Sequence, residues 1–377
     1  MNFGLPDVWV QIISLVAGAF LLAIVPLTAM FFLIWYERKI VARIGDRLGP
    51  NNSGAYGGPY GLFQVFADAI KMFTKEDVIP DAADYWVFNI APVIVMAVAV
   101  LVWAVIPLGQ GLIGADINIG VFFILSVGAG GIVSILMAGW SSNNKYALLA
   151  ALRGVATLVG YEVPQALAVL GVVMAAGSFS LQDIVAAQDV PFILAMPIPA
   201  VLFLASLLAE LGRRPFDLVE ADSEIVAGYF IEYSGMKFGM FYLAEFMNQL
   251  MVSVLFSTLF LSGWRGPWVE QAPILGPVWL AIKTLLVMLV IQFMQYTLPR
   301  LRIDQILSVN WKFITPLALV TLSVLAVVGK LLPEGIGIWG WTLAFLLANV
   351  LVAAGALGLL AVAARRARKL AAVLEGR

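Results

Sequence analysis

The sequence contains nine long apolar stretches, and they limit the possible folds more than any other feature. They cover residues 8–36, 86–108, 121–140, 147–177, 192–209, 240–264, 278–298, 313–331 and 339–363. A helix crosses the hydrocarbon core of a membrane with about 20 apolar residues, whereas the strands of a membrane barrel would give short alternating segments. The sequence therefore predicts an all-α, polytopic membrane helix bundle with about nine transmembrane helices, several of them tilted, in one domain over residues 1–377.

The positive charges are unevenly distributed along this predicted bundle. Of the 22 Lys and Arg residues, 19 fall in alternate loops and in the C-terminal tail, while Arg265 and Lys330 fall on the other side and Lys283 lies inside the seventh stretch. Cytoplasmic loops of membrane proteins carry the excess of positive charge. We therefore expect the N-terminus outside, a cytoplasmic loop over residues 37–85, and a basic cytoplasmic tail over residues 364–377.

The chain has no cysteine and no histidine. Disulfides, thiolate clusters, histidine-ligated haem and the usual zinc sites are therefore excluded. We predict that the isolated chain holds no metal, has no catalytic residue of its own and binds no covalent cofactor. The formal net charge of −1 also excludes the strongly basic surface that binds nucleic acid.

Residues 62–75, inside the first predicted loop, have the pattern of an amphipathic helix. The polar residues Gln64, Asp68, Lys71 and Lys75 recur every three or four positions, and apolar residues fill most of the rest. Such a helix lies in the membrane interface. Two roles are open at this point, a surface helix that faces lipid and a helix that roofs an apolar cavity.

Four ionisable residues lie within or at the ends of apolar stretches, namely Glu162, Glu210, Glu245 and Lys283. Such groups are costly in a membrane and usually face a protein interior or a water path. They suggest proton traffic, although Glu210 and Glu245 lie close enough to span ends to reach water directly.

The segment 210–239 is an acidic loop on the same predicted side as the basic loops. It carries five acids and no base between Asp217 and Glu232, and an apolar run interrupts the acids. A merely solvated loop does not need that apolar run, so we expect the segment to fold back against protein. A loop that binds a partner protein would show the same pattern.

Several ordered motifs resemble one family. They are residues 35–39 (WYERK), 49–51 (GPN), 67–71 (ADAIK), 138–149 (AGWSSNNKYALL), 161–164 (YEVP), 213–218 (RRPFDL), 232–236 (EYSGM) and 300–305 (RLRIDQ). Together they resemble the H subunits of the proton-pumping NADH:quinone oxidoreductases, or respiratory complex I. The chain departs from the usual family residues at Gly212, Arg214 and Asp222.

The resemblance implies a membrane component that forms much of the quinone tunnel and couples quinone reduction to proton translocation. By position, the residues expected to line or gate the tunnel are Glu37, Arg38, Gln64, Asp68, Lys71, Arg213, Phe216 and Asp217. Those expected to form an acidic proton path are Glu162, Glu210, Glu220, Asp222, Glu224 and Glu232, and Glu245 joins them as an acid within a span.

The same resemblance implies the surroundings of the chain. Quinone would be a substrate rather than a resident cofactor, and the redox centres would belong to other subunits. The expected partners are the peripheral iron-sulfur and quinone-reducing subunits, neighbouring small membrane subunits and the lipid of a prokaryotic plasma (inner) membrane. The residues alone also allow a secondary cation transporter, or a membrane anchor of a related hydrogenase-like complex that reduces no quinone.

Overall fold

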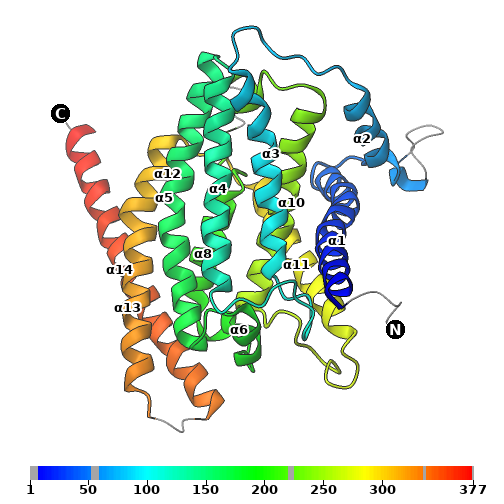
Figure 1. Ribbon diagram of the computed structural model, residues 1–377. Helices are drawn as coiled ribbons and strands as arrows, with labels where there is room; N and C mark the ends of the chain where they lie inside the picture. The colour runs from blue at the N-terminus through cyan, green and yellow to red at the C-terminus, as the bar shows by residue number, and fades with distance from the viewer. Residues whose placement is uncertain (1–6, 52–58, 220–224, 334–336, 376–377) are drawn as a thin grey trace.

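The computed structural model describes residues 7–51, 59–219, 225–333 and 337–375, and that part of the chain is helical without any β-strand. The long helices run side by side as one bundle (Figure 1). They are α1 (Asp7–Ile44), α3 (Tyr85–Leu101), α4 (Gly120–Ser141), α5 (Lys145–Ala176), α10 (Gly235–Phe260), α11 (Leu275–Thr297), α13 (Thr315–Leu331) and α14 (Ile338–Glu375). The predicted all-α polytopic bundle is therefore confirmed, with 8 helices in the described residues long and apolar enough to cross a membrane.

Shorter helices complete the fold. They are η2 (Pro59–Gly61), α2 (Gln64–Thr74), η3 (Val102–Val105), α6 (Leu181–Ala187), α7 (Phe192–Ala195), α8 (Pro197–Glu210), η4 (Gly228–Phe230), α12 (Ile303–Val309) and η5 (Asn310–Ile314). The helix predicted over residues 62–75 is confirmed as α2, which packs against α1 and α10.

The fifth predicted stretch differs from the other eight. It is divided at Met196 into α7 and α8, because the residue before a proline is disfavoured in the helical conformation and Pro197 begins the second piece. Helix α8 has 14 residues. At about 1.5 Å per residue it spans about 21 Å, which is less than the hydrocarbon core of about 30 Å. Helix α8 is enclosed by α5, α10, α13 and α14, and a broken helix is tolerated at membrane depth when protein surrounds it.

Helix α10 occupies the centre of the bundle. The most apolar 18-residue segment of α10 is 78% buried, whereas that of α14, at one edge of the bundle, is 17% buried. Helix α10 packs against α1, α3 and α11. Aromatic rings fill the space towards α8, where Phe203 lies 6.3 Å from Phe256 and 5.6 Å from Phe260 between ring centroids. The polar side chains carried by α10 therefore project into protein rather than into lipid.

Helices α1 and α14 both extend beyond the ends of the apolar stretches that predicted them. Helix α1 continues to Ile44, so the first residues of the predicted loop over residues 37–85 are helical, including Glu37 and Arg38. Helix α14 continues to Glu375, so most of the predicted tail over residues 364–377 extends that helix. In Figure 1, α1 begins at the lower end of the bundle and α14 finishes at the upper end, where α2 and the loop before α10 also lie.

Candidate functional site

The upper end of the bundle contains a cavity of about 560 Å³ between α1, α2 and α11. We call it the α1–α2 cavity. Its walls include Glu37, Arg38, Gln64, Phe246 and Tyr296. Helix α2 is held against α1 by Phe66, whose ring stacks on Phe31 at 5.0 Å between centroids. Helix α2 contributes Gln64 to the cavity wall and leaves Ile70 and Phe73 exposed, so it both borders the cavity and presents an apolar face outward.

Glu37 is the most deeply buried charged group of this cavity, with 5% of its surface exposed. The Tyr296 hydroxyl donates to Glu37 Oε1 at 2.9 Å, and Glu37 Oε2 has no hydrogen-bond partner among the described residues. A buried carboxyl oxygen without a partner is expensive. Glu37 is therefore placed to accept a hydrogen bond from a group that enters the cavity.

Arg38 and α2 form the polar rim. Arg38 pairs with Asp68 at 2.8 Å, with both side chains partly exposed, and Gln64 Nε2 donates to Asp68 Oδ1 at 3.2 Å. Lys71 is exposed one turn further along α2 and is not part of the cavity wall. Four of the eight residues predicted to line a tunnel thus gather at one opening.

A second cavity of about 370 Å³ lies between the α8–α10 loop and the end of α11. We call it the arginine cavity, since Arg213, Arg214 and Arg300 are in its wall together with Asp217. Asp217 is paired with Arg300 and lies 3.9 Å from Arg214. Tyr296 is in the wall of this cavity as well as of the α1–α2 cavity. The two cavities therefore meet at one side chain.

Gly212 begins this loop in the left-handed region, with φ of 59°. Asparagine and glycine are the residues that adopt this conformation most readily. Gly212 thus supplies the backbone turn that carries Arg213 and Arg214 into the cavity.

Phe216 occupies a different position from the other predicted tunnel residues. It is buried, and its ring lies 5.0 Å from the ring of Tyr161 on α5. It is in the wall of neither the α1–α2 cavity nor the arginine cavity. In the described structure, Phe216 packs the loop onto α5.

Partly buried acids continue from the arginine cavity into the bundle. Arg213 pairs with Glu245 at 3.3 Å. Glu245 and Glu210 are both in the wall of a narrow space of about 70 Å³. Glu210 is also in the wall of a further cavity of about 220 Å³, together with Glu162 and Gln165. Shared walls thus connect the three predicted acids with one another.

Glu210 is held by a neutral partner. Gln165 Nε2, one helical turn beyond Glu162 on α5, donates to Glu210 Oε2 at 2.7 Å. Across the cavity, a Cβ atom added to Gly128 would lie 3.6 Å from Glu210 Oε1. The glycine-rich part of α4 therefore lets the α4 backbone lie close to the Glu210 carboxyl group.

The far end of the acidic loop is tied to the start of α5. Asn144 Nδ2 donates to Glu232 Oε1 at 2.6 Å. The next residue, Tyr233, stacks its ring on Phe88 with 4.0 Å between centroids and donates to the Phe88 carbonyl at 3.2 Å. Burial raises the pKa of Tyr233 to about 12, although its contact with Ser141 acts in the other direction. Tyr233 therefore keeps its proton at neutral pH and acts as a fixed donor.

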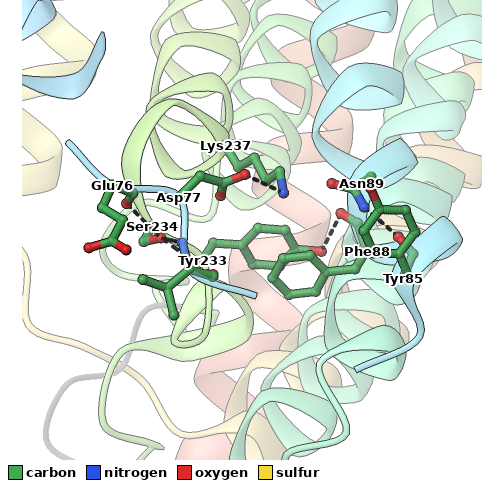
Figure 2. Close-up of polar contacts among 9 residues, drawn as sticks. Glu76, Asp77, Tyr85, Phe88, Asn89, Tyr233, Ser234 and Lys237 are labelled. Carbon is green, nitrogen blue, oxygen red and sulfur yellow. Dashed lines mark hydrogen bonds and ion pairs between the residues drawn. The ribbon is translucent and has the colours of Figure 1, made fainter. Parts of the chain in front are cut away.

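Figure 2 shows how the same segment is joined to the chain that follows α2. Lys237 pairs with Asp77 at 2.7 Å and lies 5.5 Å from the ring centroid of Phe88. The Val78 amide donates to Ser234 Oγ at 2.8 Å. These contacts join α3, α10 and the segment after α2 into one unit, so the acidic loop folds back onto protein at this end, as predicted.

Three predicted acids, Glu220, Asp222 and Glu224, lie outside the described residues. Within the described residues, no cluster of acids could hold a metal ion.

Sequence reasoning missed the neutral side chains of the site. Tyr296, Gln165 and Gln295 are in the cavity walls, yet a tyrosine or glutamine inside an apolar stretch carries little signal. Arg300 lies in the motif of residues 300–305, and its pairing with Asp217 joins that motif to residues 213–218.

Comparisons with known proteins agree with the motifs. The family model described as NADH dehydrogenase matches residues 17–326. The NADH-quinone oxidoreductase H subunit of Dehalococcoides mccartyi (strain CBDB1) is 47% identical over 321 residues, which cover 85% of this chain and 87% of the relative. The H 2 subunit of Syntrophobacter fumaroxidans is 43% identical, covering 82% and 94%, and the H subunit of Thermomicrobium roseum is 40% identical, covering 85% and 97%.

Proposed function

This chain belongs to the NADH dehydrogenase family, that of the H subunits of the NADH-quinone oxidoreductases, and from this membership we propose that it forms the passage by which quinone reaches its site of reduction. The chain is a multi-pass membrane component of an enzyme complex. Quinone is its substrate, and other subunits supply the redox centres.

The observation that carries the proposal is the meeting of the two cavities at Tyr296. A volume of about 560 Å³ lies within the usual range for sites that bind small molecules, about 300–1,000 Å³. The α1–α2 cavity combines apolar residues such as Ile34, Val41 and Phe246 with the polar or charged side chains of Glu37, Arg38, Arg47, Gln64 and Tyr296. A quinone needs this combination, since its ring and tail are apolar and its two carbonyl oxygens accept hydrogen bonds.

Fixed donors at the inner end suit the quinone oxygens. The guanidinium groups of Arg213 and Arg300 and the hydroxyl of Tyr296 border the arginine cavity. A guanidinium has several N–H donors and keeps its protons, so Arg213 and Arg300 can each donate a hydrogen bond to a carbonyl oxygen. The single donor of the Tyr296 hydroxyl is directed at Glu37, which links the two cavities. The two arginines therefore bind and orient the quinone oxygen rather than protonate it.

The partly buried acids supply the second part of the proposal. Reduction of quinone takes up protons, and the space next to Arg213 leads through Glu245 and Glu210 towards Glu162 by shared cavity walls. Glu232, with Glu220, Asp222 and Glu224, completes the set of acids assigned to this path. We infer that a change of charge at the quinone is transmitted along these carboxyl groups into the membrane-spanning part of the protein.

The surroundings of the chain follow from its family and its charge. The partners are the peripheral iron-sulfur and quinone-reducing subunits and neighbouring small membrane subunits. The peripheral subunits would meet the upper end of the bundle in Figure 1, and the small membrane subunits would pack beside the membrane-spanning helices. The location is a prokaryotic plasma (inner) membrane with the N-terminus outside. Reporter fusions after Leu108 and after Arg377 test this orientation, since they must report opposite sides of the membrane.

Labelling the assembled complex with a photoreactive quinone tests the proposed passage. We expect crosslinks to peptides of α1 and α11 around Glu37 and Tyr296, suppressed by excess natural quinone, and none on the exposed face of α14. Crosslinks confined to other segments would contradict the proposal. A complex without any quinone labelling would favour the hydrogenase-like anchor.

A further inference from the structure

A cavity at the opposite end of the bundle has no part in the quinone passage. It has a volume of about 740 Å³ and lies where the α10–α11 loop meets the segment between α6 and α7. Its walls include Ser262, Trp264, Arg265, Glu270 and Lys283. In Figure 1 this loop lies at the lower end, far from α2.

Hydrogen-bond donors converge on this cavity. Lys283 Nζ donates to the carbonyl groups of Gly263 at 2.9 Å and Arg265 at 2.6 Å, and an ammonium group has three donors. Ser262 is 6% exposed, and its Oγ has no partner among the described residues. The same is true of the buried Trp264 Nε1. Unused donors beside a cation are suited to a phosphate group.

The acids of the cavity are placed differently. Asp189 is already paired with Arg265 at 2.9 Å. Glu270 is exposed, and no cation pairs with it in the described part of the chain. The inner wall therefore suits an anion, whereas the rim suits a cation. A headgroup that carries a phosphate and an ammonium group meets both requirements.

An apolar surface leads away from the cavity along α11. Leu286, at the middle of α11, is in the cavity wall and is 59% exposed, and Leu289, Val290 and Phe293 continue the exposed surface towards the C-terminal end of the helix. Trp268, which is 68% exposed, lies in the loop at the same end. Tryptophan is enriched where membrane meets water. The headgroup cavity thus opens onto an apolar surface that acyl chains can cover.

We propose that this cavity binds one zwitterionic phospholipid, with the phosphate held by Lys283 and Ser262, the ammonium group beside Glu270 and the acyl chains along α11. The site is independent of quinone passage. It anchors the α10–α11 loop to the membrane surface at the end opposite the quinone site.

A matched pair of substitutions at Ser262 tests the phosphate contact. Ser262 has φ of 58°, a conformation that Asn and Asp both tolerate, so Ser262→Asn and Ser262→Asp differ mainly in charge. Like charges placed together across an interface are strongly unfavourable, so Ser262→Asp should weaken binding of phosphatidylethanolamine by about tenfold or more relative to Ser262→Asn. The measurement is the lipid retained by the purified, assembled complex after detergent exchange. Equal retention by the two variants would overturn the proposal.

A second pair tests the lysine and the kind of ligand. Lys283→Met should remove the retained lipid, whereas Lys330→Met, an exposed lysine at the end of α13, should keep it. Retention of the lipid by an assembled Lys283→Met complex would show that this lysine only holds the loop. If Lys283→Met fails to assemble, the Ser262 pair decides. Inorganic phosphate should not displace the lipid, and displacement at equal concentration would indicate a site for a free anion instead.

Discussion

Two groups of carboxyl side chains in this protein differ in what holds them. Asp68, Asp217 and Glu245 are paired with Arg38, Arg300 and Arg213. Glu210 and Glu232 are held instead by the amide groups of Gln165 and Asn144. An arginine cannot release its proton in a protein, so its carboxylate partner stays charged while the pair lasts. An amide is neutral, so its partner can gain a proton without breaking an ion pair.

The two groups also occupy different places. The arginine-held acids border the α1–α2 cavity, the arginine cavity and the entrance to the interior. Of the amide-held acids, Glu210 lies on the inner side, where it shares a cavity with Glu162, and Glu232 lies at the start of α5. We infer that the first group orients quinone through fixed charges and that the second group exchanges protons. Substitutions among the residues that bind quinone and among the acids that exchange protons test this inference.

The largest effect is expected at Glu162. Glutamine preserves the size and polarity of Glu162 but cannot carry a proton, so Glu162→Gln should leave the complex assembled and lower quinone-linked turnover and proton pumping by about a hundredfold, within the range for positioned acid–base groups. Turnover and pumping are measured in proteoliposomes. The matched control is Asp116→Asn at the opposite end, where Asp116 accepts a hydrogen bond from Ser180, and it should change neither rate. Full pumping by the Glu162→Gln complex would contradict the assignment.

A smaller effect is expected at Arg213. Its side chain is 14% exposed and lies 5.8 Å from the ring centroid of Phe246. Arg213→Lys keeps the charge and loses the planar donors, so quinone reduction should fall by about tenfold, as for the loss of one hydrogen bond to a charged group. Electron transfer to a soluble acceptor upstream should stay normal. Equal loss of both activities would instead indicate failed assembly.

Arg38 gives a graded comparison with Arg213. Its side chain is 42% exposed, and exposed ion pairs contribute about 1 kcal/mol or less. Arg38→Lys should therefore lower quinone reduction by about threefold, less than Arg213→Lys does. Steady-state kinetics on the two assembled variants measure the ratio. A larger loss at Arg38 would place the tighter quinone contact at the outer cavity.

The smallest effect on turnover is expected at Tyr233, a neutral donor that keeps its proton because its pKa is about 12. Tyr233→Phe preserves the ring that stacks on Phe88 and removes the hydroxyl, which should lower stability by about 1 kcal/mol. Thermal unfolding of the assembled complex measures the loss. The pH profile of turnover should be unchanged between the variant and the parent, and a shifted profile would mean that Tyr233 takes part in proton transfer.

The sequence was sufficient to predict the bundle, because membrane helices require long apolar runs, and α2, because its polar residues recur at helical spacing. It could not predict which side chain pairs with which. Tyr296 and Glu37 are 259 positions apart and Asn144 and Glu232 are 88 apart, and such pairings depend on the packing of α1, α5 and α11. The break at Met196 had a signal in Pro197, but the apolar residues on both sides of it read as one continuous span.

Infrared difference spectroscopy on quinone reduction in the assembled complex tests the division between fixed and exchanging carboxyl groups most directly. The carbonyl stretch of protonated carboxyl groups should change when quinone is reduced. Part of that change should disappear in Glu210→Gln, whose parent residue is held by an amide, and persist in Asp68→Asn, whose parent residue is held by Arg38. Loss of the signal in Asp68→Asn together with a full signal in Glu210→Gln would contradict the account.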